Sequence, residues 1–591
     1  MANEHLKLQI NHINDTHSHF DPFPLPITLP SYDGRGTEQQ HSVEIFVSCG
    51  GFARVKTALE LKKQQAVKKG IPSLNLHGGD CFQGSLYFSF FHGEANAPLL
   101  NTLDLDGMVL GNHELDLGNL PVANFLDQVN FPFFSGNWNL SQEDESKANT
   151  LKNRKNGYFY NNKTQLAEVK YFHFNPKPSD NSHTIALFGL SIDQMAKIAS
   201  PDPDTWFESA VEVAKNTVKA LHGKGINNIV LLSHQGLELD KKLAQEVDGI
   251  SLIVGGHSHT MQGDFRPFGY GNHGEYGIAI NQTLILQAGC NTIALGSAII
   301  AFSESGKASL EEGENQLLLG QKIFINAEKT IQVSAAESAY YHHYLQQQSN
   351  ILFCHKDPQV EALLDHQYRK EIKELQQQHI THIVEPLRHV RIPDHKGGSQ
   401  VGPHVAAGML RQARELGVKA DFAIHNAGGV RSSLPVGRLS AADIAGKLLP
   451  FAVNVVSFEI TGKYIIAALE GAINNATNNG VSGTGTGSFP YTAELRFCYQ
   501  GNKAHGRRMT NCQSLINGRW VDIIDDKNYT VVTTAFTAMG KEGYFALLSR
   551  DNEIMPLTAT LADSFINYCK SNPTLGKIAQ DLNTFIPCDC E

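Results

Sequence analysis

The chain has little of several features that would assign a protein to a structural class outright. Its 591 residues include only nine cysteines, too few for a disulfide-stabilised scaffold. No apolar run approaches the roughly 18 residues that a membrane-spanning helix needs. The best candidate, residues 283–302, is interrupted by Gln287, Asn291 and two glycines, so it predicts two strands. A net charge of −10 offers no basic surface for a nucleic acid polymer. These absences leave a globular protein.

Two further features concern the termini and the cysteines. The chain runs almost directly from Met1 into a predicted strand, so no signal peptide is visible. Either the protein stays inside the cell or a leader is missing from this sequence. Cys498 and Cys512 flank a short polar segment. A disulfide between them is one alternative, but two unpaired cysteines are the favoured prediction. Cys588 and Cys590 lack metal-binding partners and are predicted to be ordinary, or at most redox-labile, tail residues.

Five strand-like runs in the first half each end at side chains able to bind a metal ion. The candidate ligands that follow them are Asp15, His17, Asp80, Asn112, His234, His257 and His259. One such residue at a strand end is usually structural, but five in order indicate a common site at the edge where α/β proteins bind ligands. Seven donors are too many for one tetrahedral site and suit two metals that share a carboxylate. Imidazole, carboxylate and amide donors favour Mn²⁺, Zn²⁺, Co²⁺ or Fe.

The segment 111–118 carries the candidate catalytic groups. Taken alone, Asn112-His113 after a strand is more often a structural turn. The functional interpretation depends on the similar residues at the other strand ends. His113 follows a candidate ligand and is available to face a substrate. Asp116, three residues on, is placed to orient the imidazole and favour its charged form. We hypothesise that His113 stabilises the transition state or protonates a leaving alkoxide.

A different kind of site is predicted in the second half. A strand ends at Asn426 and runs into a turn containing Gly429, with Arg431 beyond it. Backbone N–H groups brought close by glycines, together with a guanidinium, suit a phosphate or a ribose edge, although an ordinary glycine turn explains the motif alone. Phe451 and Phe536 follow on separate loops, where such residues are more often core than ligand clamp.

The chain between these regions is less informative. A length of 591 residues predicts at least two domains. Residues 141–182 are predicted to be a surface excursion rather than a domain. Apolar residues recur at helical spacing over residues 357–379, which fits a plain surface helix or a helix that connects two unlike halves.

The order of the motifs resembles a known family. The series Asp-x-His, Gly-Asp, Gly-Asn-His-Glu, His, Gly-His-x-His is similar to the calcineurin-like metallophosphoesterases, and the forms at 14–17, 111–116 and 255–259 resemble the exported 5′-nucleotidases. The resemblance implies a four-layered α/β sandwich that holds two divalent ions. It assigns Asp15, His17, Asp80 and His259 to one metal, and Asp80, Asn112, His234 and His257 to the other, with Asp80 bridging.

The C-terminal motifs are similar to the C-terminal domain of the same family. The resemblance implies that Phe451 and Phe536 sandwich the base, that Arg431 contacts phosphate, and that Asn426 and Gly429 line the pocket. Two departures stand out. Glu542 occupies the place of a shorter acid that would serve the ribose, and the family's arginine motif is loosened over residues 395–404, which leaves Arg391 as the nearest substitute.

We therefore predict an α/β protein with a dimetal catalytic domain (1–350), a connecting helix (351–380) that acts as a hinge region, and an α/β nucleotide-binding domain (381–591). The predicted activity is hydrolysis of nucleoside 5′-monophosphates by a water activated between two metals. The alternatives are a nucleotide sugar, a cyclic nucleotide or a dinucleotide such as NAD as substrate, or an inactive nucleotide-binding protein of the same fold. The resemblance favours a periplasmic or extracellular location over a cytoplasmic one.

Overall fold

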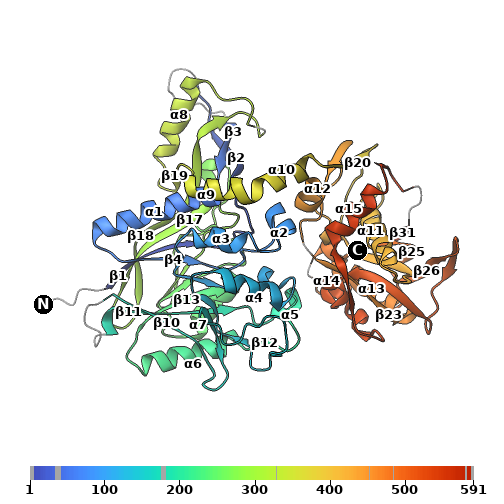
Figure 1. Ribbon diagram of the computed structural model, residues 1–591, viewed down its shortest axis with the longest axis horizontal. Coiled ribbons are helices and arrows are strands. Elements are labelled where there is room, and N and C mark those ends of the chain that lie inside the picture. The colour runs from blue at the N-terminus through green and yellow to red at the C-terminus, as the bar shows by residue number, and fades with distance from the viewer. Residues whose placement is uncertain are drawn as a thin grey trace. The chain divides into compact units, whose positions relative to one another are not determined.

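The computed structural model describes residues 6–32, 42–174, 181–327, 329–451, 453–483, 485–578 and 582–587. The chain separates into two compact units (Figure 1). The first comprises Met1–Gln83 and Phe91–Arg369, and the second comprises Gly84–Phe90 and Lys370–Glu591.

Two β-sheets form the centre of the first unit. The larger has the order β2 (Phe23–Pro30), β3 (Ser42–Cys49), β18 (Ala308–Phe324), β17 (Ala294–Phe302), β1 (Leu6–Ile13), β4 (Ser73–His77), β5 (Gly107–Val109), β6 (Phe133–Ser135), β8 (Gly157–Asn161) and β9 (Leu166–Ala167), with β19 (Ile351–Phe353) paired to β18. The smaller has the order β10 (Lys170–His173), β11 (Thr184–Ser191), β13 (Asn228–His234), β14 (Leu252–Val254), β16 (Thr283–Leu286) and β15 (Ile278–Ile280). The run 283–302 thus forms two strands, as predicted.

The apolar side chains of the strands arrange these sheets into four layers. Leu8 and Leu76 of the larger sheet pack against Leu187 and Val230 of the smaller one in a common core. The opposite face of the smaller sheet is covered by α6 (Ala210–His222) and α7 (Leu237–Glu246), whose buried residues include Val213 and Leu243. Helix α1 (Phe52–Lys69) contacts the larger sheet through β1, β4, β17 and β18. The predicted α/β sandwich is confirmed.

The strand directions bring the predicted ligand loops together. Strands β1, β4 and β5 run parallel in the larger sheet, and β13 and β14 run parallel in the smaller one. Since carboxyl ends of parallel strands meet at one edge, the loops that follow them form the rim where a ligand binds.

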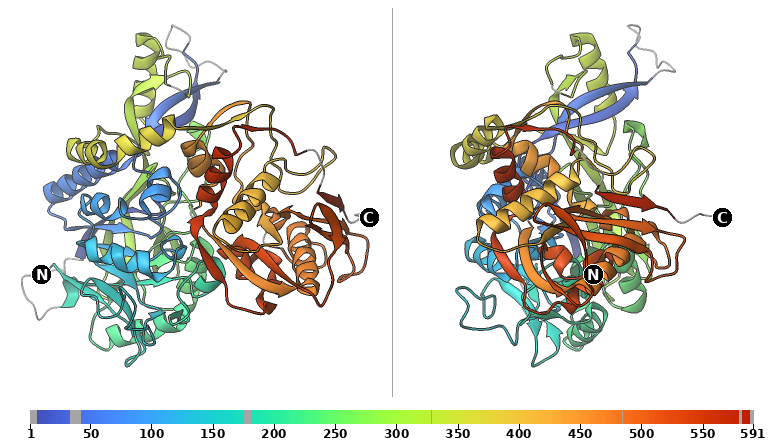
Figure 2. Two further views of the ribbon diagram at one scale, coloured as in Figure 1. Left: turned by 45° about the vertical axis from the view of Figure 1, so that its right-hand side comes forward. Right: turned by 90° about the vertical axis from the view of Figure 1, so that its right-hand side faces the viewer.

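A hairpin of β2 and β3 extends the larger sheet, and helix α8 (Ala335–Gln346) lies beside it (Figure 2). Leu25, Ile45 and Val47 of the hairpin share an apolar cluster with Tyr341 and Leu345 of α8. A capping box at Ser334 and Glu337 begins the helix.

The second unit is built on a sheet with helices on both faces. Its strand order is β24 (Pro490–Ala493), β21 (Phe422–Asn426), β28 (Asn528–Thr534), β23 (Asn454–Thr461) and β29 (Met555–Thr560). Helices α11 (Gly402–Glu415) and α15 (Leu561–Lys570) pack on one face through residues such as Met409 and Phe565. Helix α13 (Gly462–Thr477) covers the other face through Ile465 and Leu469.

Two smaller sheets complete this unit. One has the order β22 (Gly437–Ser440), β20 (His379–Ile383) and β30 (Thr574–Leu575), and the other β27 (Arg519–Asp522), β26 (Met509–Ile516), β25 (Leu495–Gln500) and β31 (Asn583–Ile586). A short piece of the N-terminal half also belongs here. Leu86 and Phe90 of α2 (Leu86–Phe91) pack against the core of the second unit, and Ser89 Oγ donates to the Ala445 carbonyl at 3.2 Å.

The predicted helix over residues 357–379 is interrupted. Asp357 caps α9 (Pro358–Leu364) by accepting from two backbone N–H groups, a π-helical turn follows, and α10 (Lys370–Gln377) continues. Arg369, in the π turn, is held by Asp21 and Glu361, each at 2.8 Å. The boundary between the two units falls directly after this residue.

The expectations for the cysteines and for membrane helices can be compared with the structure where it describes the residues concerned. Cys498 and Cys512 are both free thiols, so the less favoured disulfide is not formed. Cys588 and Cys590 lie outside the described residues. Among the residues that the structure describes, no helix is long and apolar enough to cross a membrane.

Candidate functional site

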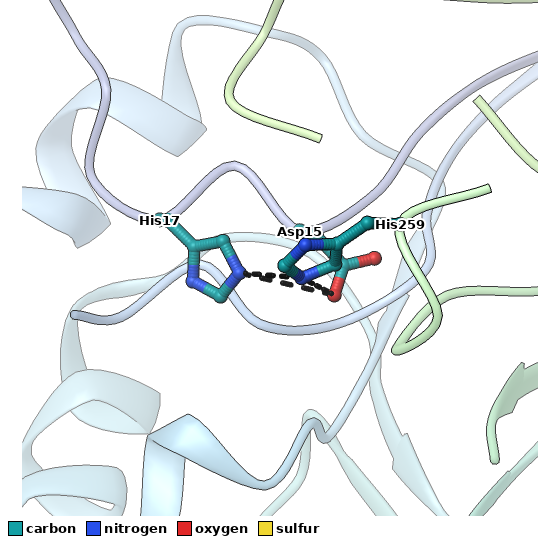
Figure 3. Close-up of side chains that lie close together, drawn as sticks. All are labelled: Asp15, His17 and His259. Atoms are coloured by element: carbon teal, nitrogen blue, oxygen red, sulfur yellow. Dashed lines mark hydrogen bonds and ion pairs between the residues drawn. The ribbon is translucent and has the colours of Figure 1, made fainter. Parts of the chain in front are cut away.

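Asp15, His17 and His259 direct three donor atoms at one point (Figure 3). His259 Nε2 lies 3.3 Å from Asp15 Oδ1 and 3.1 Å from His17 Nε2. His17 Nδ1 donates to the Phe82 carbonyl at 3.1 Å, which leaves Nε2 with a lone pair for a cation. Asp15 and His17 follow β1, whereas His259 follows β14.

A second group is formed by Asp80, His234 and His257. His234 Nδ1 donates to the Gly78 carbonyl at 2.7 Å, so its Nε2 is the free donor atom. That Nε2 lies 3.1 Å from Asp80 Oδ2. His257 Nδ1 lies 2.8 Å from the Asn112 side-chain oxygen, which brings the fourth predicted member of this group into place.

The donor chemistry of both groups fits divalent cations. Buried polar groups are normally hydrogen-bonded, yet His234 Nε2 is fully buried and makes no properly aligned hydrogen bond despite facing a carboxylate. In the first group two imidazole nitrogens face each other. Carboxylate and imidazole atoms that converge on one point in this way are what a divalent cation binds.

The pKa values of these imidazoles are also consistent with a cation site. Burial lowers the pKa of His17 and of His257 to about 4, so both remain neutral donors. Burial also lowers the pKa of His234, but Asp80 outweighs it and raises the pKa to about 9. The hydrogen bond to Asp15 raises the pKa of His259 to about 10. A cation would replace these protons, so affinity for metal falls as pH falls.

Five of the seven predicted ligands have a left-handed backbone. The φ angles are 49° for Asp15, 47° for His17, 57° for Asp80, 72° for His257 and 54° for His259. Non-glycine residues rarely adopt this conformation, which costs about 1–3 kcal/mol each and concentrates at functional sites.

Glu114 is a residue of the site that the motifs did not single out. Its fully buried carboxylate accepts hydrogen bonds from the backbone N–H groups of Asp80 (3.2 Å), Cys81 (2.6 Å), Phe82 (3.1 Å) and Gly111 (2.7 Å). It therefore fastens the loop after β4 to the loop after β5. The acidic residue of the Gly-Asn-His-Glu motif could have indicated this role from the sequence. Only the fold shows which backbone groups Glu114 binds.

His113 and Asp116 are in direct contact. His113 Nδ1 lies 2.7 Å from Asp116 Oδ2, and the His113 backbone N–H donates to Asp80 Oδ1 at 2.9 Å. Burial lowers the pKa of His113, but Asp116 and Asp80 outweigh it and raise the pKa to about 10. The imidazole is thus a protonated group beside the candidate ligand Asp80, held by Asp116 on its Nδ1 side.

In the second unit, the turn after β21 gathers part of the predicted substrate site. Asn426 donates to Glu542 Oε2 at 3.4 Å and accepts from Thr537 Oγ1 at 3.5 Å. Gly429 must lack a side chain because a Cβ there would lie 2.5 Å from the ring of buried His425.

Arginines flank the same turn. The Arg431 guanidinium lies over the Phe451 ring, 5.5 Å from its centre, and Nη1 donates to the Gly428 carbonyl. Arg391 donates to Thr486 Oγ1 at 3.5 Å. Burial raises the pKa of the Glu542 carboxyl, and the nearby charge of Arg391 opposes that rise. Burial lowers the pKa of Arg431, and the like charge of Arg391 lowers it further. Phe536 lies in α14 (Ala535–Ala538), after β28.

The comparisons with known proteins agree with this geometry. The family model of calcineurin-like phosphoesterases matches residues 8–261, and that of the 5′-nucleotidase C-terminal domain matches residues 380–549. The fold and its two ligand groups therefore define a metal-dependent phosphoester hydrolase, whose family uses divalent metal ions.

The chain belongs to the 5′-nucleotidase family, as the motifs predicted. The NAD 5′-nucleotidase of Haemophilus influenzae is 30% identical over 97% of this chain and 91% of that protein. The crystal structure of the 5′-nucleotidase precursor of Thermus thermophilus has a TM-score of 0.65 and 26% identity, covering 98% of this chain and 99% of that one. The structure of Haemophilus influenzae NAD nucleotidase has a TM-score of 0.62 and 27% identity, covering 99% and 100%.

Replacing Glu114 by glutamine is expected to weaken metal binding about 10- to 100-fold, as loss of an outer-shell partner typically does. The amide keeps one acceptor oxygen, so its N–H₂ would face two of the four backbone donors, and the anchor of the Asp80 loop would weaken. Competition with a chelator measures the affinity. Glu238→Gln, at a side chain 85% exposed on α7, is the matched control, and equal affinities for the two variants would contradict the role.

The two ligand groups are expected to lose metal separately. His259→Ala removes a donor of the first group and His234→Ala a donor of the second, so each variant should retain about one of two bound ions. Elemental analysis after dialysis gives the ratio of metal to protein. The exposed His343→Ala serves as control. A full complement of metal in both variants would exclude these groups as the sites.

Proposed function

We propose that this chain hydrolyses nucleotide phosphate esters, releasing a nucleoside and phosphate from nucleoside 5′-monophosphates. The observation that carries the proposal is the placement of His113 and Asp116 against the second ligand group, with the His113 main chain bonded to Asp80. The first metal is assigned to Asp15, His17, Asp80 and His259, and the second to Asp80, Asn112, His234 and His257. Mn²⁺, Zn²⁺, Co²⁺ and Fe suit these donors.

Each group then has a defined task. Two cations in these groups would lower the pKa of a water and stabilise the charge that develops on the phosphate. As the bond from phosphorus to the water oxygen forms, the bond to the ester oxygen breaks. The proton on His113 Nε2 passes to that leaving oxygen. Asp116 holds the Nδ1–H side of the ring and stabilises the imidazolium before transfer.

The second unit is proposed to bind the nucleoside. Phe451 and Phe536 would stack on the base, which tolerates different bases because every base has a π-face. Asn426 and Gly429 would line the pocket, Glu542 would accept from the ribose hydroxyls, and Arg431 would contact phosphate. Arg391 is proposed to supply the cation that the loosened family motif lacks, because it lies near Arg431 and Glu542.

A dinucleotide such as NAD is the second candidate substrate. It is supported by the similarity to a full-length relative named for NAD hydrolysis. Two guanidinium groups near one turn, Arg391 and Arg431, would suit a ligand with more than one phosphate. We also propose an exported protein, periplasmic or extracellular, as the family resemblance favours.

Removing the imidazole of His113 is expected to reduce kcat about 10²- to 10⁴-fold, the usual contribution of a positioned acid. Metal content should stay unchanged, because His113 supplies no ligand. Unchanged turnover in metal-loaded His113→Ala would reject the assignment. In the parent enzyme Asp116 raises the pKa of His113, so loss of the His113 proton should lower kcat in alkaline solution. Asp116→Asn removes that charge and should move the alkaline limb to lower pH.

Shortening Phe451 to leucine is expected to raise KM for adenosine 5′-monophosphate about 5- to 150-fold, the equivalent of roughly 1–3 kcal/mol of base stacking. The KM for p-nitrophenyl phosphate, which has no base, should not change. Phe545→Leu, at a side chain 71% exposed in the same unit, is the matched control. Similar KM values for the two variants would contradict the stacking role. The ratio of turnover on NAD to that on nucleoside monophosphates decides between the candidate substrates.

A further inference from the structure

We propose that Gln83 is a positioning residue for His113 and acts through Asp116. The proposal rests on the function proposed for His113 as the group that protonates the leaving oxygen. Gln83 itself needs no contact with substrate or metal for this role.

The geometry is a chain of two hydrogen bonds that meet at one atom. Gln83 Nε2 lies 2.7 Å from Asp116 Oδ2, and His113 Nδ1 lies 2.7 Å from the same oxygen. A carboxylate has no proton to give, so the amide must present its N–H₂ group there. Both bonds are charge-assisted, which makes them stronger than bonds between neutral groups.

Gln83 is held in place by the loop that carries the bridging carboxylate. It follows Asp80 by three residues, is 1% exposed and has a φ of 66°. Its neighbour Phe82 donates from its backbone N–H to Glu114 and accepts from His17 Nδ1. The position of Gln83 is therefore fixed by the same contacts that fix the ligands.

A single bond from His113 would leave the Asp116 carboxylate able to rotate about its own side chain. The second bond, from a buried donor on a different loop, fixes Oδ2 where the imidazole needs it. The imidazole is in turn fixed at Nδ1, so Nε2 keeps one direction. Small losses of alignment are costly because proton transfer requires hydrogen-bond geometry.

The test replaces Gln83 by methionine, which has similar length and volume but no donor. With a nucleoside 5′-monophosphate, kcat should fall roughly tenfold, the usual effect of losing one hydrogen bond to a charged group. KM, metal content and the thermal unfolding temperature should stay unchanged. With p-nitrophenyl phosphate, whose leaving group needs little protonation, kcat should fall less than about twofold by the same reasoning.

A double-variant cycle separates action through Asp116 from a general effect on the loop. In the Asp116→Ala background, Gln83→Met should cost nothing further, because the oxygen that it positions is gone. Gln128→Met, at an exposed glutamine at the end of α4 (Asn119–Gln128), is the matched control and should match the parent enzyme.

The outcomes are distinct. Full activity of Gln83→Met, an equal loss with both substrates, or additive losses in the cycle would each overturn the proposal. If Gln83→Met loses metal or stability, the ratio of the two substrates at saturating metal still decides. His113→Ala tests the underlying function separately: a strong loss there with none for Gln83→Met rejects the positioning role alone, whereas no loss in His113→Ala rejects the function proposed for His113.

Discussion

The structure depends on keeping the Asp80 carboxylate charged in a place that water does not reach. A buried carboxylate without compensation would cost several kcal/mol. Here one oxygen accepts from the His113 backbone N–H and the other faces His234 Nε2. Both contacts come from loops other than its own. The compensation therefore exists only when three strand ends, from two sheets, meet, and a cation between them would complete it.

The loops that achieve this are strained and are held by hydrogen bonds to compensate. Left-handed conformations at Asp15, Asp80 and His257 would be unfavourable in isolation. The four backbone donors on Glu114 hold the loops after β4 and β5 together, and the His257 N–H donates to Asp15. Strain at the site is thus stabilised by buried acids and by the parallel strands beneath, which pack in the core between the sheets.

Sequence reasoning was strongest where chemistry and spacing occur together. The two strands within 283–302 were predicted correctly, since apolar runs bounded by polar residues define them. The helix over 357–379 was drawn as continuous, but it contains a π turn at Asp365–Arg369, where Arg369 is held by Asp21 from a distant strand end. No local pattern contains that contact. Glu114 and Gln83 were missed for the same reason, because each has a partner 33 residues away in the chain.

The sequence by itself determined the types of candidate ligand, their order along the chain, the α/β class and the family. It could do so because side-chain chemistry and strand periodicity are local properties. Only the tertiary structure decided which donor atoms converge on a common site. It also decided that His17 and His234 each donate from Nδ1 to a backbone carbonyl, and that Arg391 lies near Glu542. It also showed that residues 84–90 belong to the second unit. These facts depend on contacts between distant segments, which are fixed by packing and by the need to satisfy buried polar groups.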